Sequence, residues 1–376
     1  MSDPVRILNL FTIMNRGGAE TMVMNYYRNI DRTKVQFDFM VHREERGAYD
    51  DEIEALGGKI YRMPPVQPGY FREYKAKIAE FFDEHEEYSI IHSHMSELGY
   101  YVFKEAKSRG IKCTVCHAHN APHFSDETFI EKVKDIVRNY FKHKIRKYVD
   151  HMFICGVEAG DWLFGKENSD RFVMMNNAVD ARRFSWDEQK AEEVRKKLDL
   201  EGKFVICHVG RFNSQKNHTF LIDIFKEINE KNKNAVLLLV GAGELEEKIR
   251  QKVSDLQLDG SIRFMGLRDD VDDIMRASDV FLFPSLYEGL PVTLVEAQSS
   301  GIKCIISESI PDDCKITHNI ETVSLEKPAE FWAEQVLKYA DGYERKHTLK
   351  EISAAKFDIK ENAEWLEEFY LNEYKK

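Results

Sequence analysis

Two glutamates stand eight residues apart in the segment YEGLPVTLVEA (287–297), one on each side of a Gly-Leu-Pro turn. The preceding run VFLFPSL is apolar, β-branched and aromatic, which is typical of a buried strand. Pro291 and Gly301 mark the start and the end of the helix predicted next. Glu288 therefore falls in a strand–helix loop and Glu296 within the helix. Alone, each could be an ordinary surface charge, but together they flank a helix N-terminus, which attracts anions.

Two cations follow another predicted strand. Arg211 and Lys216 share the loop RFNSQKNH, directly after the apolar run FVICHVG. A guanidinium and an ammonium group can stabilise the charge that develops on a diphosphate leaving group, without a metal ion. For either residue alone, a solvated surface charge is the simpler interpretation.

Glycines and acids supply weaker signals. Gly17 and Gly18 open a predicted helix after the first strand, where backbone can approach a phosphate closely. The loop GAGEL lacks a dinucleotide fingerprint because Glu246 stands where the third glycine is needed, and no GxxxxGK[ST] sequence occurs. The acids DDVDD (269–273) could bind Mg²⁺, but their place before a helical pattern favours a helix start.

Four histidines follow two other strands at a spacing of two residues: His92 and His94 in IIHSH, and His117 and His119 in CHAHN. Side chains at positions i and i+2 of a strand share a face. The set could hold a metal ion, or it could offer neutral hydrogen-bonding groups to sugar hydroxyls. For any one of the four alone, a packing role is the default.

Composition limits the possible functions. The 376 residues are 43% hydrophobic and 32% charged, with a net charge of −11, which argues against nucleic acid as a partner. No apolar run reaches the roughly 18 residues of a membrane span, and the start MSDPVRILNLF is not a secretory signal. We therefore expect a cytoplasmic protein. Cys113 and Cys116 form a CxxC, the pattern of some zinc and redox sites, but it lies in a strand-like run and no second pair accompanies it. Buried packing is therefore expected for the cysteines.

The order of apolar runs predicts an α/β fold. Strand-like runs alternate with helical patterns in two successive series, and the alternation breaks near residue 180. The pattern predicts two Rossmann-like, doubly wound parallel-sheet domains, at 1–180 and 181–357. The amphipathic segment 358–376 is expected to pack back on the first domain. In such sheets ligands bind at the carboxyl ends of the strands.

The motif order GGAE, HxH, HVGRFNSQKNH, GAGE, FMG and SDVFLFPSLYEGLPVTLVEA resembles that of retaining glycosyltransferases of family 4, especially bacterial exopolysaccharide and capsule transferases. The resemblance covers essentially the whole chain, and its most specific part is the E-x7-E motif of Glu288 and Glu296. It implies the GT-B architecture, in which two Rossmann-like domains face a central cleft. One departure is Ala178 in NNAVD, where many relatives have a glycine after the asparagine.

The resemblance also implies roles for individual residues. Arg211 and Lys216 match the family's phosphate-binding pair, and His119 matches the histidine that contacts the donor sugar, with His117 as the alternative. The implied catalytic residues are His119, Glu288, Arg211 and Lys216. The implied donor-binding residues are Gly17, Gly18, Arg211, Lys216, Gly241, Glu288, Gly289, Leu290, Thr293 and Glu296.

The implied activity is transfer of a hexose from a nucleotide diphosphate, most often UDP, to a lipid-linked or growing glycan acceptor in polysaccharide biosynthesis. The configuration at the sugar is retained, and no metal is required. Backbone N–H groups beside Gly289 and Leu290 would meet the phosphate. Glu288 would accept hydrogen bonds from the sugar, and Glu296 would hold the ribose diol.

Three alternatives stay open. A retaining glycosidase also uses two carboxylates, but it has no need of Arg211 and Lys216. A nucleotide-sugar epimerase can share the architecture, and product analysis without an acceptor distinguishes it. A non-catalytic sugar-nucleotide-binding partner of another transferase would bind the donor without turnover.

A basic segment suggests a membrane partner. Residues 130–148 read IEKVKDIVRNYFKHKIRKY, in which apolar residues recur at helical spacing among lysines and arginines, although the chain as a whole is acidic. The pattern predicts peripheral, salt-sensitive contact with anionic lipid on the inner face of the cell membrane. An ordinary surface helix is the alternative.

Overall fold

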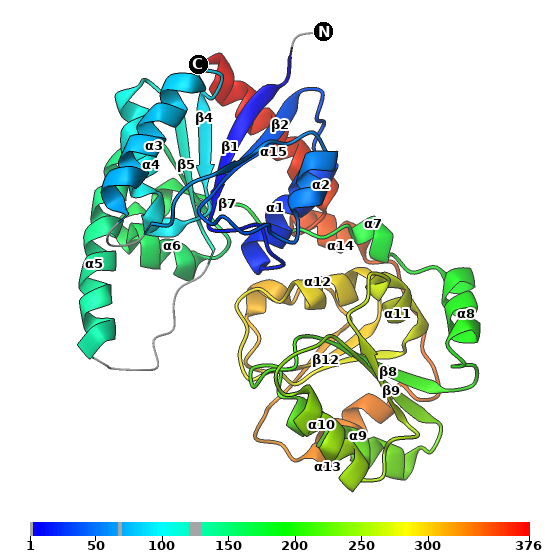
Figure 1. The fold of residues 1–376 in the computed structure, drawn as a ribbon. Helices are drawn as coiled ribbons and strands as arrows, with labels where there is room; N and C mark the ends of the chain where they lie inside the picture. The colour runs from blue at the N-terminus through cyan, green and yellow to red at the C-terminus, as the bar shows by residue number, and fades with distance from the viewer. Residues whose placement is uncertain (1–2, 67–69, 120–128) are drawn as a thin grey trace. The chain divides into compact units, whose positions relative to one another are not determined.

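The computed structural model describes residues 3–66, 70–119 and 129–376, and for 129–134 the backbone only. The chain forms two compact units. Unit 1 comprises Met1–Ala178 with Ile359–Lys376, and unit 2 comprises Val179–Asp358. The first boundary lies two residues from the predicted division at 180. Both units are built on parallel sheets covered by helices (Figure 1), which confirms the predicted fold class.

Unit 1 contains a seven-stranded parallel sheet in the order β3-β2-β1-β4-β5-β6-β7. The chain order reverses between β1 and β4, so the loops after these strands diverge to opposite faces of the sheet. The strands are β1 (Val5–Phe11), β2 (Val35–Val41), β3 (Ile60–Arg62), β4 (Ile90–Ser93), β5 (Cys113–Ala118), β6 (His151–Ile154) and β7 (Phe172–Met174).

Helices cover both faces of this sheet. One face packs against α1 (Gly18–Asn29), α2 (Asp50–Ala55) and α15 (Ile359–Lys375). The other packs against α3 (Phe71–Glu84), α4 (Tyr100–Ser108), α5 (Phe129–Ile145) and α6 (Val157–Phe164). The C-terminal helix α15 thus returns to unit 1, where Leu366 and Tyr370 are buried in the core beside α1 (Figure 1).

Unit 2 contains a six-stranded parallel sheet in the order β10-β9-β8-β11-β12-β13. Its order reverses between β8 and β11. The strands are β8 (Phe204–Val209), β9 (Ala235–Val240), β10 (Ile262–Gly266), β11 (Val280–Phe283), β12 (Lys303–Ser307) and β13 (Ile320–Val323). The helices are α7 (Ala181–Phe184), α8 (Glu188–Lys197), α9 (His218–Lys231), α10 (Glu246–Asp255), α11 (Val271–Ala277), α12 (Val292–Ser299), α13 (Ala329–Leu337) and α14 (Leu349–Ala354).

Among the α5 residues whose side chains are described, part of the apolar stripe that the sequence predicts to face lipid packs inside unit 1 instead. Ile145 is fully buried in the core of unit 1, and the Phe141 ring packs on Tyr100 and Tyr101. The apolar stripe therefore anchors the helix to its own domain. Val137 of the same stripe is exposed, as are Ile136 and Tyr140 beside it. No described helix is long and apolar enough to cross a membrane.

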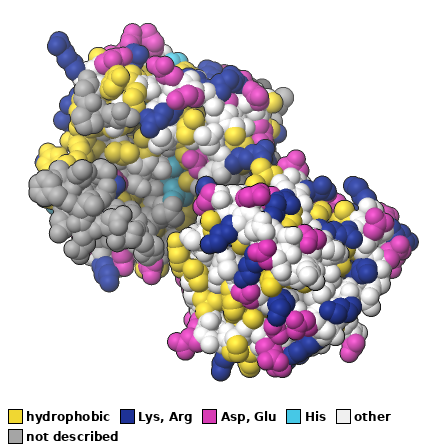
Figure 2. All heavy atoms as spheres, turned by 60° about the horizontal axis from the view of Figure 1, so that its bottom comes forward, with side chains coloured by type: hydrophobic (Ala, Val, Ile, Leu, Met, Phe, Trp, Pro, Cys, Tyr) yellow, Lys and Arg dark blue, Asp and Glu magenta, His cyan; other side chains and the backbone are white. Residues whose placement is uncertain are grey.

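The cysteines are buried, as the sequence predicts, and none forms a disulfide. Cys155 lies one residue beyond the end of β6. Acidic and basic side chains of the described residues are interspersed over the face of the molecule in Figure 2.

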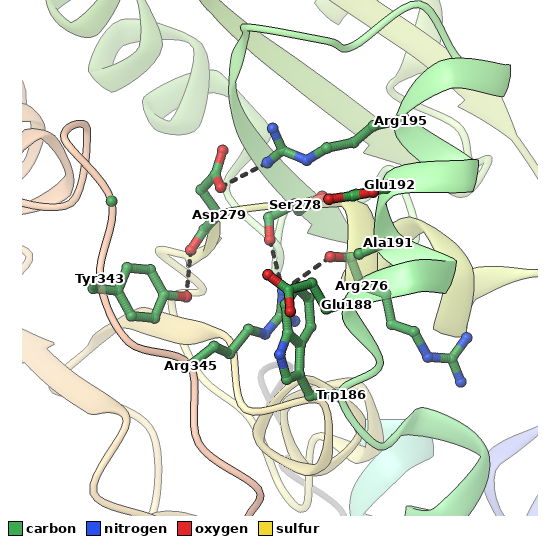
Figure 3. A pocket seen from close by; sticks show the side chains of 11 residues that line it. Trp186, Glu188, Ala191, Glu192, Arg195, Arg276, Ser278, Asp279, Tyr343 and Arg345 are labelled. Carbon is green, nitrogen blue, oxygen red and sulfur yellow. Dashed lines mark hydrogen bonds and ion pairs between the residues drawn. The ribbon is translucent and has the colours of Figure 1, made fainter.

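One arginine ties several elements of unit 2 together. The Arg345 guanidinium donates hydrogen bonds to the carbonyls of Met275, Ser278 and Ser300, and it stacks 4.1 Å from the Trp186 ring. Burial lowers its pKa to about 10, because the charged form loses water. It lies on the wall of a hollow of about 220 Å³ (Figure 3).

The other polar groups of this hollow also pair with one another. Arg195 Nη2 lies 2.6 Å from Asp279 Oδ1, and the Tyr343 hydroxyl donates to the Asp279 carbonyl at 2.8 Å (Figure 3). None of the predicted site residues lines the hollow. We conclude that these contacts hold the segment before α14 against α11 and α12.

We expect Arg345→Lys to lower the free energy of unfolding by about 2 kcal/mol, since an ammonium group cannot reach all the carbonyls that the guanidinium fork serves. Equilibrium urea unfolding followed by circular dichroism measures the loss. Arg250→Lys is the control, because Arg250 is exposed, pairs with Glu246 of its own helix and lies over the Phe264 ring. Exposed contacts of this kind are weak, so a change of less than about 1 kcal/mol is expected. Equal midpoints for the two variants would contradict the structural role of Arg345.

Candidate functional site

The loops that follow β8 and β11 bring two predicted site residues together. Lys216 Nζ lies 2.7 Å from Glu288 Oε1, and Gln215 Nε2 donates to Glu288 Oε2 at 3.0 Å. Both charged side chains are largely buried, with 13% of Lys216 and 6% of Glu288 exposed. An ion pair in such surroundings is screened little by water. Gln215 was not predicted, although it adjoins Lys216 in the same loop.

Backbone contacts hold these two loops against each other. Leu286 N–H donates to the Gln215 carbonyl at 2.8 Å, and the Asn217 side chain donates to the Pro284 carbonyl at 3.1 Å. Asn217 also begins α9 with a left-handed backbone (φ 54°), a conformation that asparagine tolerates better than most residues. The ion pair therefore sits on a fixed backbone frame.

Gly241, another predicted donor-binding residue, has a packing role. Its backbone is in a region open to glycine (φ +135°), and a Cβ there would lie 2.1 Å from the Gly210 carbonyl oxygen. The loop after β9 thereby rests on the loop that carries Arg211. The Arg211 side chain itself is 72% exposed and contacts Glu244 at 3.4 Å. It stands apart from the Lys216–Glu288 pair.

Glu288 and Glu296 lie as the sequence predicts, the first in the loop and the second on α12, which begins after Pro291. Gly289 is exposed at this loop, and Leu290 packs partly on the core of unit 2. Burial raises the pKa of Glu296 to about 7, and Asp272 adds to the increase, while Arg183 opposes it. The hydroxyl of Thr293, on the same helix, is buried without a hydrogen-bond partner among the described residues.

Arg183 was missed by sequence reasoning. It stands on α7, far from α12 in the chain, and it pairs with Asp272 at 2.7 Å. The acids of DDVDD begin α11, as predicted. Asp272 and Asp273 both contact Arg276, so arginines already compensate their charge.

In unit 1, Gly17 and Gly18 stand at the N-terminus of α1, as predicted. Gly17 is the N-cap residue, with φ −91°, and Gly18 is the first helical residue. Gly18 has no atom within 4 Å of the position of a Cβ. Its backbone is therefore open to an approaching group, and α1 is long enough to present a helix dipole.

His119 follows β5 and has both ring nitrogens engaged. Its Nε2 lies 2.8 Å from His94 Nδ1, and its Nδ1 lies 3.3 Å from Cys155 Sγ. Burial lowers the pKa of His119 to about 3, so the imidazole is neutral at physiological pH. His119 is partly exposed, whereas the alternative, His117, is fully buried. The contacts of His119 with His94 and Cys155 join residues at the ends of three strands. The sequence carried no signal for Cys155.

Comparison with known proteins decides the family. Residues 190–356 match the family model for glycosyl transferases group 1. The chain is 34% identical over 367 residues to the putative glycosyltransferase EpsF of Bacillus subtilis, covering 96% of this chain and 95% of that protein. The chain belongs to the group 1 glycosyltransferases.

Two further likenesses agree with this assignment. The glycosyltransferase is 29% identical over 247 residues to the Escherichia coli UDP-Gal:alpha-D-GlcNAc-diphosphoundecaprenol alpha-1,3-galactosyltransferase, covering 64% of this chain and 63% of that one. Its fold resembles that of Anabaena Alr3699/HepE, solved in complex with UDP, with a TM-score of 0.71, 18% identity and coverage of 96% and 94% of the two chains. The architecture is thus that of GT-B glycosyltransferases.

The raised pKa of Glu296 gives a pH-dependent contribution to the stability of this glycosyltransferase. A carboxyl whose pKa is higher in the folded state stabilises the fold at low pH, and the contribution is lost as the pH rises through about 7. We therefore expect the free energy of unfolding of the wild type, relative to Glu296→Gln, to fall between about pH 5 and pH 8. Urea unfolding across this range measures it, with Glu247→Gln on the exposed face of α10 as the control. A flat difference for Glu296→Gln would show that its carboxyl is not perturbed.

Proposed function

We propose that this glycosyltransferase is a retaining hexosyltransferase of family 4 that uses a UDP-sugar. The observation that carries the proposal is the buried pair of Lys216 and Glu288 beside the N-terminus of α12. Lys216 supplies a cation that can bind a diphosphate, and Glu288 supplies a carboxylate that can bind a sugar. A glycosidase has no use for the cation, and the UDP complex of Alr3699/HepE supports UDP as the nucleotide.

Each residue then has a distinct role on the donor. Lys216 and the exposed Arg211 stabilise the charge that grows on the diphosphate as the bond to the sugar breaks. Glu288 accepts hydrogen bonds from the transferred sugar, and Glu296 holds the ribose diol. His119 is neutral because it is buried, so it forms hydrogen bonds with the sugar without adding charge. The leaving phosphate takes the proton of the attacking hydroxyl on the same face, so no protein nucleophile is needed.

We further propose a lipid-linked acceptor in polysaccharide biosynthesis. The E. coli relative, by its name, transfers galactose to a sugar on diphosphoundecaprenol. Such an acceptor lies at a membrane, and α5 of unit 1 offers a suitable surface. Ile136, Val137 and Tyr140 are exposed there by 70%, 49% and 56%. Lys144 Nζ lies 5.3 Å from the Tyr140 ring, and Lys147 is exposed one turn on. Apolar anchors beside cations are typical of helices that lie on anionic lipid.

A panel of nucleotide sugars tests the activity. We expect one UDP-sugar to be hydrolysed slowly without acceptor and transferred with retention to a lipid-linked glycan, both in the presence of EDTA. Lys216→Ala should lower kcat by about 10²-fold, the scale for losing a transition-state donor, whereas Lys248→Ala on the exposed face of α10 should not. Activity that needs added Mg²⁺ or Mn²⁺ would overturn metal independence. Epimerised donor without transfer, or binding without turnover, would establish one of the alternatives instead.

The lipid surface is tested by flotation with vesicles that contain phosphatidylglycerol. We expect weak binding at low salt that is lost in high salt. Ile136→Ser and Tyr140→Ser should each weaken it by removing an anchor, and Lys144→Ser with Lys147→Ser should reduce its salt dependence. Leu267→Ser is the matched control, because Leu267 is 72% exposed but lies in unit 2. Binding that is unchanged by the α5 variants would contradict the assignment of this surface.

A further inference from the structure

Three buried histidines of unit 1 gather at the carboxyl ends of the neighbouring strands β4 and β5. The ring of His92 stacks 4.3 Å from that of His94, and the ring of His117 lies 5.5 Å from the first and 5.4 Å from the second. One nitrogen of each imidazole lies within 4.8 Å of one nitrogen of each of the others. The roles proposed for the donor site use none of the three.

Two ring nitrogens of this trio have no hydrogen-bond partner among the described residues. They are His92 Nε2 and His117 Nδ1, on side chains that are 1% and 0% exposed. A buried polar atom without a partner costs free energy, which a bound group would recover.

The second nitrogen of each of these rings is already held. His92 Nδ1 lies 2.6 Å from the Tyr370 hydroxyl, and His117 Nε2 lies 3.2 Å from Cys155 Sγ. When these nitrogens donate their protons, the lone pairs stand on the two unpartnered atoms. A contact of this kind fixes the tautomer of histidines that bind metals.

We propose that His92, His94 and His117 bind one divalent cation of the zinc class. Atoms within 4.8 Å of one another lie no more than about 2.8 Å from a common centre, roughly 0.7 Å beyond a Zn–N bond. The planes of the His92 and His94 rings lie 23° apart in a stack, so binding an ion requires one of these rings to turn about its Cβ–Cγ bond. His94 supplies the third nitrogen at the cost of a 3.4 Å contact between its Nε2 and Asn9 Oδ1. Neutral imidazoles are ligands that zinc prefers and magnesium does not.

A second combination, His117, His119 and Cys155, is also close enough to hold an ion. It is less suitable because both nitrogens of His119 already have partners, and each would have to be given up. The proposed trio leaves both contacts of His119 in place. It also fixes the His119 ring through His94, because the two rings share a 2.8 Å contact.

Metal content tests the proposal without reference to transfer, so its failure and that of the proposed activity are distinguishable. The full chain is stripped with dipicolinate, dialysed against Zn²⁺ and analysed by mass spectrometry. We expect about one tightly held zinc ion per chain, and its loss in His92→Gln and His117→Gln. Tyr370→Phe removes the contact that orients His92 and should weaken zinc affinity by about 10–100-fold. His208→Gln is the control, because His208 is a buried histidine of unit 2 and its change should leave the zinc in place.

Three results would overturn the proposal. They are no tightly held zinc in the wild type, zinc retained in folded His92→Gln, and zinc lost in Cys155→Ser but kept in His92→Gln, which identifies the second combination. Circular dichroism checks folding. Should His92→Gln not fold, the wild type supplies the second measurement. We expect one equivalent of Zn²⁺ to raise the Tm of the stripped protein, and an unchanged Tm would count against the site.

Discussion

The ion pair of Lys216 and Glu288 is the interaction on which the arrangement of unit 2 depends. It joins residues 72 positions apart in the chain, in loops that follow the two strands at which the order of the sheet reverses. Removing two charges from water is costly, and their attraction offsets this only when the geometry is good and further hydrogen bonds are made. Gln215 and the backbone bonds between the loops meet that condition.

The two units place different kinds of polar group at the ends of their strands. Unit 2 places paired charges at its strand ends, and Arg183, Asp272 and Glu296 extend the set around α12. Unit 1 places histidines there, and burial lowers their pKa so that they remain neutral. The cations of unit 2 suit a nucleotide diphosphate because they balance its negative charge. Neutral imidazoles suit a sugar, or a cation that would be repelled by imidazolium.

Helix α5 shows how one amphipathic pattern can serve two surfaces. The C-terminal part of its apolar stripe, which includes Ile145 and Tyr148, packs on the core of unit 1. The exposed apolar residues of α5 whose side chains are described are Val137, which belongs to that stripe, and Ile136 and Tyr140 beside it. The wider apolar face is buried in the protein because its burial lowers the free energy more than exposure to water or to a lipid surface would. What remains exposed is a narrow apolar strip beside lysines, which is a feature of helices that bind lipid weakly and reversibly.

The sequence by itself determined the fold class, the order of the elements and the position of both glutamates relative to α12. These follow from local periodicity, from Pro291 and Gly301 at the helix ends, and from the alternation of strands and helices, all of which act over short stretches of chain. It also placed Arg211, Lys216 and His119 in loops after strands. Only the tertiary structure decided which of them meet. Lys216 contacts Glu288 while Arg211 does not, and Arg183 and Cys155 enter through elements distant in the chain. Burial is likewise a property of the packed chain. The sequence therefore did not reveal that Glu296 has a raised pKa, or that His92 and His117 each keep a nitrogen without a partner.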